Sequence, residues 1–187
     1  MKRGFKAEAE RKAIFYRQLL SLKEHDPLPS RQLADHLKIR LLTPKDIPHI
    51  TDEILKVLLV TGKDNWSAAI YVKDDQHFII HNPTHSAFRQ ESDIMHEIAH
   101  LLCGHELKDL ETAMMGCLLP LRKYDQEQED EAEWLGSCLQ LPHKALFYYY
   151  KIKKMKEQDI SKLFNASAQM VRYRISVSGV RKINWRR

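Results

Sequence analysis

The pentapeptide His96-Glu97-Ile98-Ala99-His100 constrains this chain more than any other part of its sequence. In an α-helix a spacing of four residues brings both imidazoles onto one face, where two ring nitrogens can bind one Zn²⁺. Between them, Glu97 can polarise a water molecule on that metal. The pattern therefore predicts a metalloprotease-type site with His96 and His100 as ligands and Glu97 as the catalytic base. Two ordinary hydrogen-bonded histidines are the competing interpretation.

A third ligand is expected, because catalytic zinc sites usually take three protein ligands and leave the fourth position for water. The metzincin pattern is excluded, because Gly104 and His105 stand at the wrong offsets from His100. A carboxylate from a second helix is the alternative, and the acidic stretch 127–133 offers several. Two pairs of glutamates would each share one face of that helix, and only one pair is expected to point at the metal: Glu129 with Glu133, or Glu127 with Glu131.

The rest of the pattern predicts an α+β fold, mostly helical, with one small antiparallel sheet. Segments 66–72 and 77–81, joined by a turn at Asp74-Asp75, are typical of an antiparallel hairpin. Helices are predicted at residues 7–23, from Ser30 to about 39, from Thr51, over 86–106 and 127–141, and as two short helices between 155 and 179.

Two of these segments together resemble the ImmA/IrrE family of zinc metallopeptidases. Residues 96–100 match its H-E-x-x-H, and residues 129–142 are similar to its E-x-E-A motif and the Leu-rich run that ends near a proline. Residues 79–86 and Arg89 also resemble its strand and loop before the active-site helix. The similarity covers roughly residues 30–178. The sequence departs from the family at Glu133, Leu135 and Gly136, where Asn or Asp, Phe, and Ala are usual.

The resemblance implies a zincin-like domain in which Zn²⁺ is held by His96, His100 and Glu129, with Glu131 as the alternative third ligand. It also implies a site-specific zinc metalloendopeptidase, because known members cut helix-turn-helix transcriptional repressors and so switch on stress, DNA-damage, phage or defence genes. A DNA-binding regulator with a structural or vestigial zinc site is the alternative. The oxyanion donor is left open among His105, Tyr124 and residues 148–150.

The three cysteines are odd in number and widely spaced, which favours free thiols in a reducing compartment. With no signal-peptide-like or membrane-spanning stretch in the sequence, we expect a cytoplasmic protein without a membrane partner. Cys117 lies between the two motifs, where its thiolate could take the fourth zinc position and inhibit the enzyme. A buried, small apolar side chain is the other interpretation of Cys117.

Charge divides the chain near residue 142. Residues 143–187 hold 12 basic and 2 acidic residues, a net charge of +10, whereas residues 1–142 carry −5. We expect a metallopeptidase domain at 1–142 and a basic, helix-turn-helix-like region at 143–187, which resembles the C-terminal part of the same family. Its basic side chains could bind single-stranded DNA as an activating signal, or could simply be a solvated face. They are Lys162, Arg172, Arg174, Arg181, Lys182, Arg186 and Arg187.

Overall fold

The computed structural model describes residues 1–109 and 125–183 and has the mostly helical α+β architecture expected. In chain order the elements are α1 (Phe5–Leu19), α2 (Ser30–His36), β1 (Arg40–Leu42), η1 (Pro44–Asp46), α3 (Asp52–Lys56), η2 (Val57–Thr61), β2 (Ala68–Lys73), β3 (Gln76–His81), α4 (Ala87–Cys103), β4 (Lys108–Asp109), α6 (Gln126–Gln140), α7 (His143–Leu146), η3 (Phe147–Ile152), α8 (Glu157–Leu163), α9 (Ala168–Val177) and η4 (Val180–Lys182). None of these helices is long and apolar enough to cross a bilayer, a statement that covers the described residues.

A four-stranded sheet with the order β1-β3-β2-β4 forms one side of the molecule. The predicted hairpin is confirmed, because β2 and β3 pair antiparallel along their whole length. Asp74 and Asp75 have φ angles of 49° and 59°, as a two-residue turn that matches the twist of the strands requires. However, β1 pairs parallel to β3 and β4 pairs parallel to β2, so the sheet is mixed and not purely antiparallel.

The short strand β1 follows directly after the helix predicted from Ser30 to about 39, on residues for which the sequence pattern predicted no structure. The helix that begins at Ser30 ends at His36, and Lys38 adopts a φ of 56°, outside the helical region. The chain therefore leaves α2 in an extended conformation and reaches β3 at Arg40. Thr51 accepts a hydrogen bond from the Ile54 amide and caps α3 as predicted.

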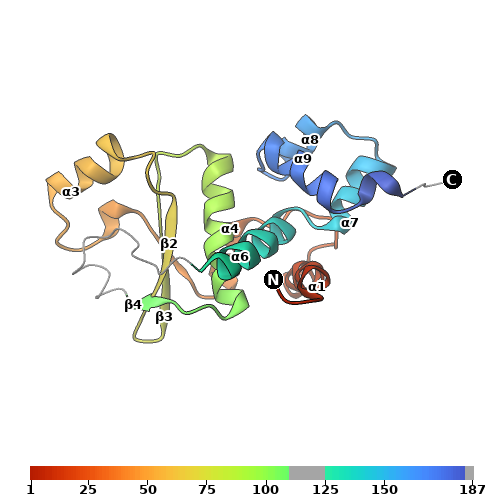
Figure 1. Ribbon diagram of the computed structural model, residues 1–187. Coiled ribbons are helices and arrows are strands. Elements are labelled where there is room, and N and C mark those ends of the chain that lie inside the picture. Colours follow the sequence, from red (N-terminus) through yellow and green to blue (C-terminus); the bar gives the residue numbers. More distant parts are fainter. Residues whose placement is uncertain (110–124, 184–187) are drawn as a thin grey trace.

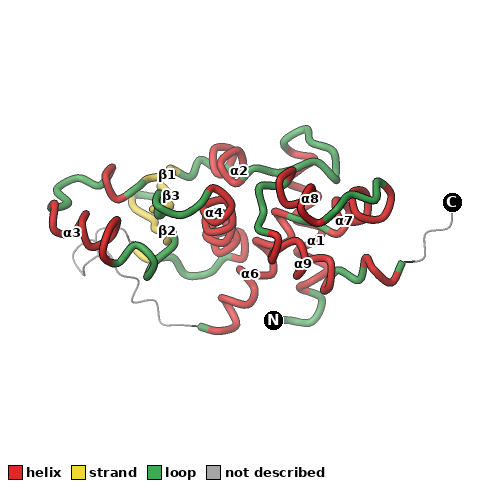
Figure 2. Tube along the Cα trace, turned by 90° about the horizontal axis from the view of Figure 1, so that it is seen from above, coloured by secondary structure: helices red, strands yellow, loops and turns green. Residues whose placement is uncertain are grey.

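Helix α4 lies between the sheet and α6, as both views show (Figures 1 and 2). Ser86 caps its first turn by accepting a hydrogen bond from the Arg89 amide. The two helices are in close contact at Gly136 of α6, where an added β-carbon would lie 3.3 Å from the Cα of His96. The absence of a side chain at this position therefore lets α6 pack closely against the backbone of α4 beside His96.

The C-terminal helices α7 to α9 pack on the other side of α4 and α6 from the sheet (Figure 1). They surround their own buried apolar cluster, which runs from Leu141 to Val180. The predicted pair of short helices is present as α8 and α9, and Ser167 caps α9 by accepting from the Met170 amide. The division into domains at 1–142 and 143–187 stays a prediction, because α1 contacts residues on both sides of that boundary.

Two buried arginines join α1 and α9 to the end of α6. From α1, Arg17 donates to the carbonyl oxygen of Leu139 at 2.9 Å, and from α9, Arg174 donates to that of Leu141 at 3.0 Å. Arg174 also forms an ion pair with Glu10 of α1. Burial lowers the pKa of Arg17 to about 10, so its guanidinium stays charged near neutral pH. These contacts supply donors to carbonyl groups that the end of a helix leaves unpaired.

Candidate metal centre

His96 and His100 lie one turn apart on α4, and their Nε2 atoms are 3.1 Å from each other. The ligand atoms of His96, Glu97 and His100 all lie within 4.8 Å of one another, close enough to surround one metal ion. The side chain of His100 is 2% exposed, whereas that of His96 is 30% exposed. The pair therefore has a buried side against the protein and an open side toward solvent.

Helix α6 adds the carboxylate of Glu129 to the two imidazoles. Its Oε2 lies 3.2 Å from the Nε2 of His96 and its Oε1 lies 3.5 Å from the Nε2 of His100. Asp125 fixes the start of this helix by accepting hydrogen bonds from the next amides along the chain. The sequence left two pairs of glutamates open as sources of the third ligand. The structure brings Glu129, from the pair with Glu133, close to both imidazoles.

Glu97 faces the sheet from the same helix, and its side chain is buried. Its Oε2 accepts a hydrogen bond from the backbone amide of Ile70 in β2 at 2.8 Å. The amide holds the carboxylate in one orientation. The motif glutamate is therefore fixed to the edge of the sheet.

A second layer of polar side chains lies behind His100. Its Nδ1 is 2.9 Å from the Nδ1 of His105, and the Nε2 of His105 is 3.4 Å from the Oε2 of Glu131. The side chains of His105 and Glu131 are 6% and 13% exposed. The side chain of His105 is thus buried against His100, and the carboxylate of Glu131 contacts the ring of His105.

From the sequence, Glu131 is expected as an alternative ligand and His105 as a candidate oxyanion donor. The structure instead places these two side chains against each other behind His100. One local signal was available, because Gly104 immediately precedes His105. Gly104 adopts a φ of 72° at the end of α4, and the His105 amide then donates to the His100 carbonyl at 3.1 Å. This is a common way for a glycine to end a helix, and it folds the next residue back onto the last turn.

The other acidic candidates on α6 point elsewhere. Glu133 is exposed, and Glu127 pairs with the amino group of Met1 at 2.8 Å. Cys117 and Tyr124 lie outside the described residues. Burial raises the pKa of the Cys103 thiol to about 11 and that of Cys138 to about 12, which keeps both thiols protonated at neutral pH.

The basic residues of the C-terminal region do not form one uniform surface. Lys162, Arg172, Arg181 and Lys182 are exposed, whereas Arg186 and Arg187 lie outside the described residues. The inclusion of Arg174 as a nucleic-acid-binding residue was wrong. Its side chain is fully buried, because Glu10 and the Leu141 carbonyl bind its guanidinium inside the protein.

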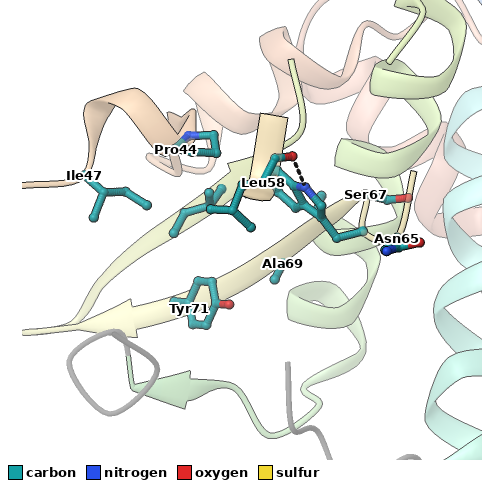
Figure 3. Close-up of a pocket in the computed structure, with 10 residues that line it drawn as sticks. Pro44, Ile47, Leu58, Asn65, Ser67, Ala69 and Tyr71 are labelled. Atoms are coloured by element: carbon teal, nitrogen blue, oxygen red, sulfur yellow. Dashed lines mark hydrogen bonds between the residues drawn. The ribbon is translucent and has the colours of Figure 1, made fainter. Parts of the chain in front are cut away.

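A cavity of about 80 Å³ lies on the face of the sheet opposite α4. Tyr71 and Ala69 of β2 form its floor, and Leu58 and Ile47 lie across from them (Figure 3). Its lining is mostly apolar and includes no member of the histidine and glutamate cluster. The cavity is therefore separate from the metal centre.

Residues 55–176 match the family model Peptidase_M78, described as an IrrE N-terminal-like domain. This chain belongs to the ImmA/IrrE family of metallopeptidases. The match spans more than half of the chain and includes the whole cluster of His96, Glu97, His100 and Glu129. Membership in this family implies peptidase activity and a bound metal. No curated protein and no solved structure gives a significant match.

Proposed function

We propose that this metallopeptidase is a zinc-dependent, site-specific endopeptidase. The observation that carries the proposal is the convergence of His96, His100 and Glu129, two imidazoles and one carboxylate from two helices. Nitrogen and oxygen donors about 2.0–2.1 Å from a tetrahedral zinc lie about 3.3 Å from one another. The two histidine Nε2 atoms are 3.1 Å apart. The Oε2 of Glu129 lies 3.2 Å from the Nε2 of His96 and its Oε1 lies 3.5 Å from the Nε2 of His100, so the three distances bracket this value. The donor set therefore fits zinc, and Glu97 lies beside it without being needed as a ligand.

A zinc ion bound there would polarise the scissile carbonyl and lower the pKa of a water molecule toward neutrality. Glu97 would take the proton of that water at Oε1 while the Ile70 amide holds Oε2. It would then deliver the proton to the nitrogen of the leaving amine. The partly exposed side of His96 gives the substrate access to these groups.

The edge of β2 offers a place for an extended substrate segment. Within the described part of the chain, β4 pairs with β2 at Tyr71 and Val72, so the edge from Ala68 to Ile70 carries no strand. That stretch is next to Glu97, because Ile70 donates to its carboxylate. A peptide added there as a further strand, leaving the Ile70 amide bonded to Glu97, would lie beside the catalytic groups. We therefore expect cleavage in loops or unfolded segments; a cut within a rigid helix of a native domain would contradict this mode of binding.

For the substrate we propose a helix-turn-helix transcriptional repressor, whose loss would switch on stress, DNA-damage, phage or defence genes. The support is the family membership together with a basic region beside the peptidase core. Single-stranded DNA is the proposed activating signal, because Lys162, Arg172 and Lys182 are exposed cations near one another in sequence.

The test is to incubate the zinc-loaded protein with the repressor encoded beside its gene, with and without single-stranded DNA. We expect one discrete cut, found by mass spectrometry, that Glu97→Gln and chelators abolish. Double-stranded DNA of the same sequence is the matched control for the activator. A wild-type protein that leaves the repressor intact under all these conditions would rule out this substrate.

A DNA-binding regulator with a structural metal is the second candidate, favoured by the same exposed cations. Glu97→Gln separates the two functions, because it spares the proposed ligands and leaves the basic region unchanged. If the regulator role is correct, repressor levels and DNA binding are the same in the variant and the wild type. If the peptidase role is correct, repressor cleavage is lost.

A further inference from the structure

We propose that His105 and Glu131 are positioning residues, which hold His100 in the orientation and tautomer that present its Nε2 to the metal. The inference rests on the proposed function, since it takes His100 to be a ligand. It assigns a role to His105 and Glu131, two largely buried polar side chains that are neither proposed metal ligands nor the proposed catalytic base.

The direction of each hydrogen bond follows from the ligand role of His100. If Nε2 of His100 binds the metal, its proton must be on Nδ1, which then donates to the Nδ1 of His105 across 2.9 Å. His105 must in turn carry its own proton on Nε2, which points at the Oε2 of Glu131, 3.4 Å away. A carboxylate can only accept, so Glu131 fixes the direction of the whole chain of bonds.

The burial of this chain argues for a role in positioning and against one in stabilising the fold. The Oε1 of Glu131 is buried and has no hydrogen-bond partner among the described residues. A largely buried carboxylate whose contact with an imidazole, among the described residues, is as long as 3.4 Å adds little to folding stability, so stability alone does not explain its presence. The Glu131 carboxylate is therefore best explained by its contact with His105, whose ring it holds in place.

Metal-binding histidines usually donate their second ring N–H to a carboxylate, a carbonyl or water. Here an additional imidazole stands between the ligand and the carboxylate. The end of α4 makes this geometry possible, because the left-handed Gly104 turns the chain and brings His105 back beside His100. In this relay from Glu131 through His105 to His100, His105 thus reaches His100 from its buried side, while the open side of the cluster stays available to substrate.

The first test measures zinc affinity by competition with a chromogenic chelator. We expect His105→Phe to weaken zinc binding by about 10- to 100-fold, the usual effect of removing such a partner. His81→Gln is the matched control, a buried histidine outside the relay, and should leave the affinity within about twofold. A His105→Phe protein that is folded by circular dichroism and binds zinc as tightly as the wild type would overturn the proposal.

The second test reads the tautomers directly by long-range ¹H–¹⁵N NMR of the zinc-loaded protein. We expect the proton of His100 on Nδ1 and that of His105 on Nε2. Glu131→Gln keeps an oxygen acceptor and should keep both tautomers and the His105 Nε2 signal, whereas Glu131→Leu removes the acceptor and should shift the Nε2 and Hε2 resonances of His105. A proton on Nδ1 of His105 in the wild type, or an unchanged spectrum in Glu131→Leu, would refute the relay.

Failure of the relay and failure of the ligand assignment give different results. If His100 and Glu129 are not ligands, His100→Ala and Glu129→Ala will bind zinc like the wild type, and the proposed function fails. If those two variants lose zinc while His105→Phe and Glu131→Leu do not, the ligand set stands and the positioning role alone is wrong.

Discussion

The backbone of Gly136 lies against that of His96, so that a β-carbon at residue 136 would stand 3.3 Å from the His96 Cα. This contact sets the distance between the helix that carries the histidines and the helix that carries Glu129. The geometry of the metal centre thus depends on a position that contributes no donor atom.

Enlarging this position should damage both stability and metal binding. We expect Gly136→Val to lower the free energy of unfolding by about 1–3 kcal/mol, the usual cost of overpacking, measured by urea denaturation. Zinc affinity should fall in the same variant, because α6 must move away from His96. Gly136→Ala is the milder control, since one carbon at 3.3 Å is partly offset by a better helix propensity. A fully stable Gly136→Val protein would show that the helices are not in close contact.

Removal of the proposed catalytic base should separate metal binding from cleavage. We expect Glu97→Gln to reduce the cleavage rate by about 10²- to 10⁴-fold, the usual contribution of a general base. Its amide oxygen can still accept the Ile70 hydrogen bond, so the fold and the zinc affinity should stay close to wild type. The checks are a cleavage time course and a chelator titration, and residual cleavage near the wild-type rate would contradict the assigned role.

Zinc should stabilise the folded protein through Glu129. A ligand that binds the native state at about 100 times its Kd adds about 2.7 kcal/mol, so we expect a clear rise in Tm when zinc is added to the apoprotein. The rise should be absent or much smaller in Glu129→Ala. Glu133→Ala, on the same helix but exposed, serves as the control and should respond like the wild type. An equal rise in all three proteins would place the metal elsewhere.

His81 should make stability depend on pH. Burial and the nearby charge of Arg31 lower the pKa of this imidazole below its usual 6.5. Below pH 6.5 the unfolded chain therefore binds more protons than the folded one, and stability falls as the pH decreases through that range. His81→Gln should flatten this part of the profile, measured by urea denaturation between pH 5 and 8. An identical slope in the variant would contradict the contribution of His81.

Arg172 and Arg174 should behave in opposite ways although both were candidates for nucleic-acid binding. Arg174→Met leaves Glu10 and the Leu141 carbonyl without their partner, and we expect a loss of about 3 kcal/mol in unfolding free energy. The exposed Arg172→Ala should change stability by less than about 0.5 kcal/mol and should weaken any binding to single-stranded DNA. Fluorescence anisotropy at increasing salt provides the binding measurement.

Local sequence patterns predicted the parts of this molecule that depend on neighbouring residues. The helical spacing of His96 and His100, the Asp74-Asp75 turn and the helix that starts from Thr51 are all short-range features, and each is present. The parallel strands β1 and β4 have three and two residues, too few for a period to be recognised.

The features that sequence could not predict depend on contacts between distant segments. Arg174 looked like any other cation in a basic stretch, and it is buried because Glu10, more than 160 residues earlier, meets it. Glu131 was one of four glutamates on two helix faces, and its partner His105 belongs to the end of another helix. Such pairs arise only when α1, α4, α6 and α9 are packed together.

The arginine contacts at the end of α6 join it to residues that lie outside the family match. The family match begins at residue 55, so a fragment limited to 55–176 would keep every proposed metal donor. It would lack Arg17, which reaches the Leu139 carbonyl, and Glu10, which neutralises Arg174. The first 54 residues therefore help to hold the end of α6 in place. A protein shortened to the matched region would lose this support of the helix that carries Glu129.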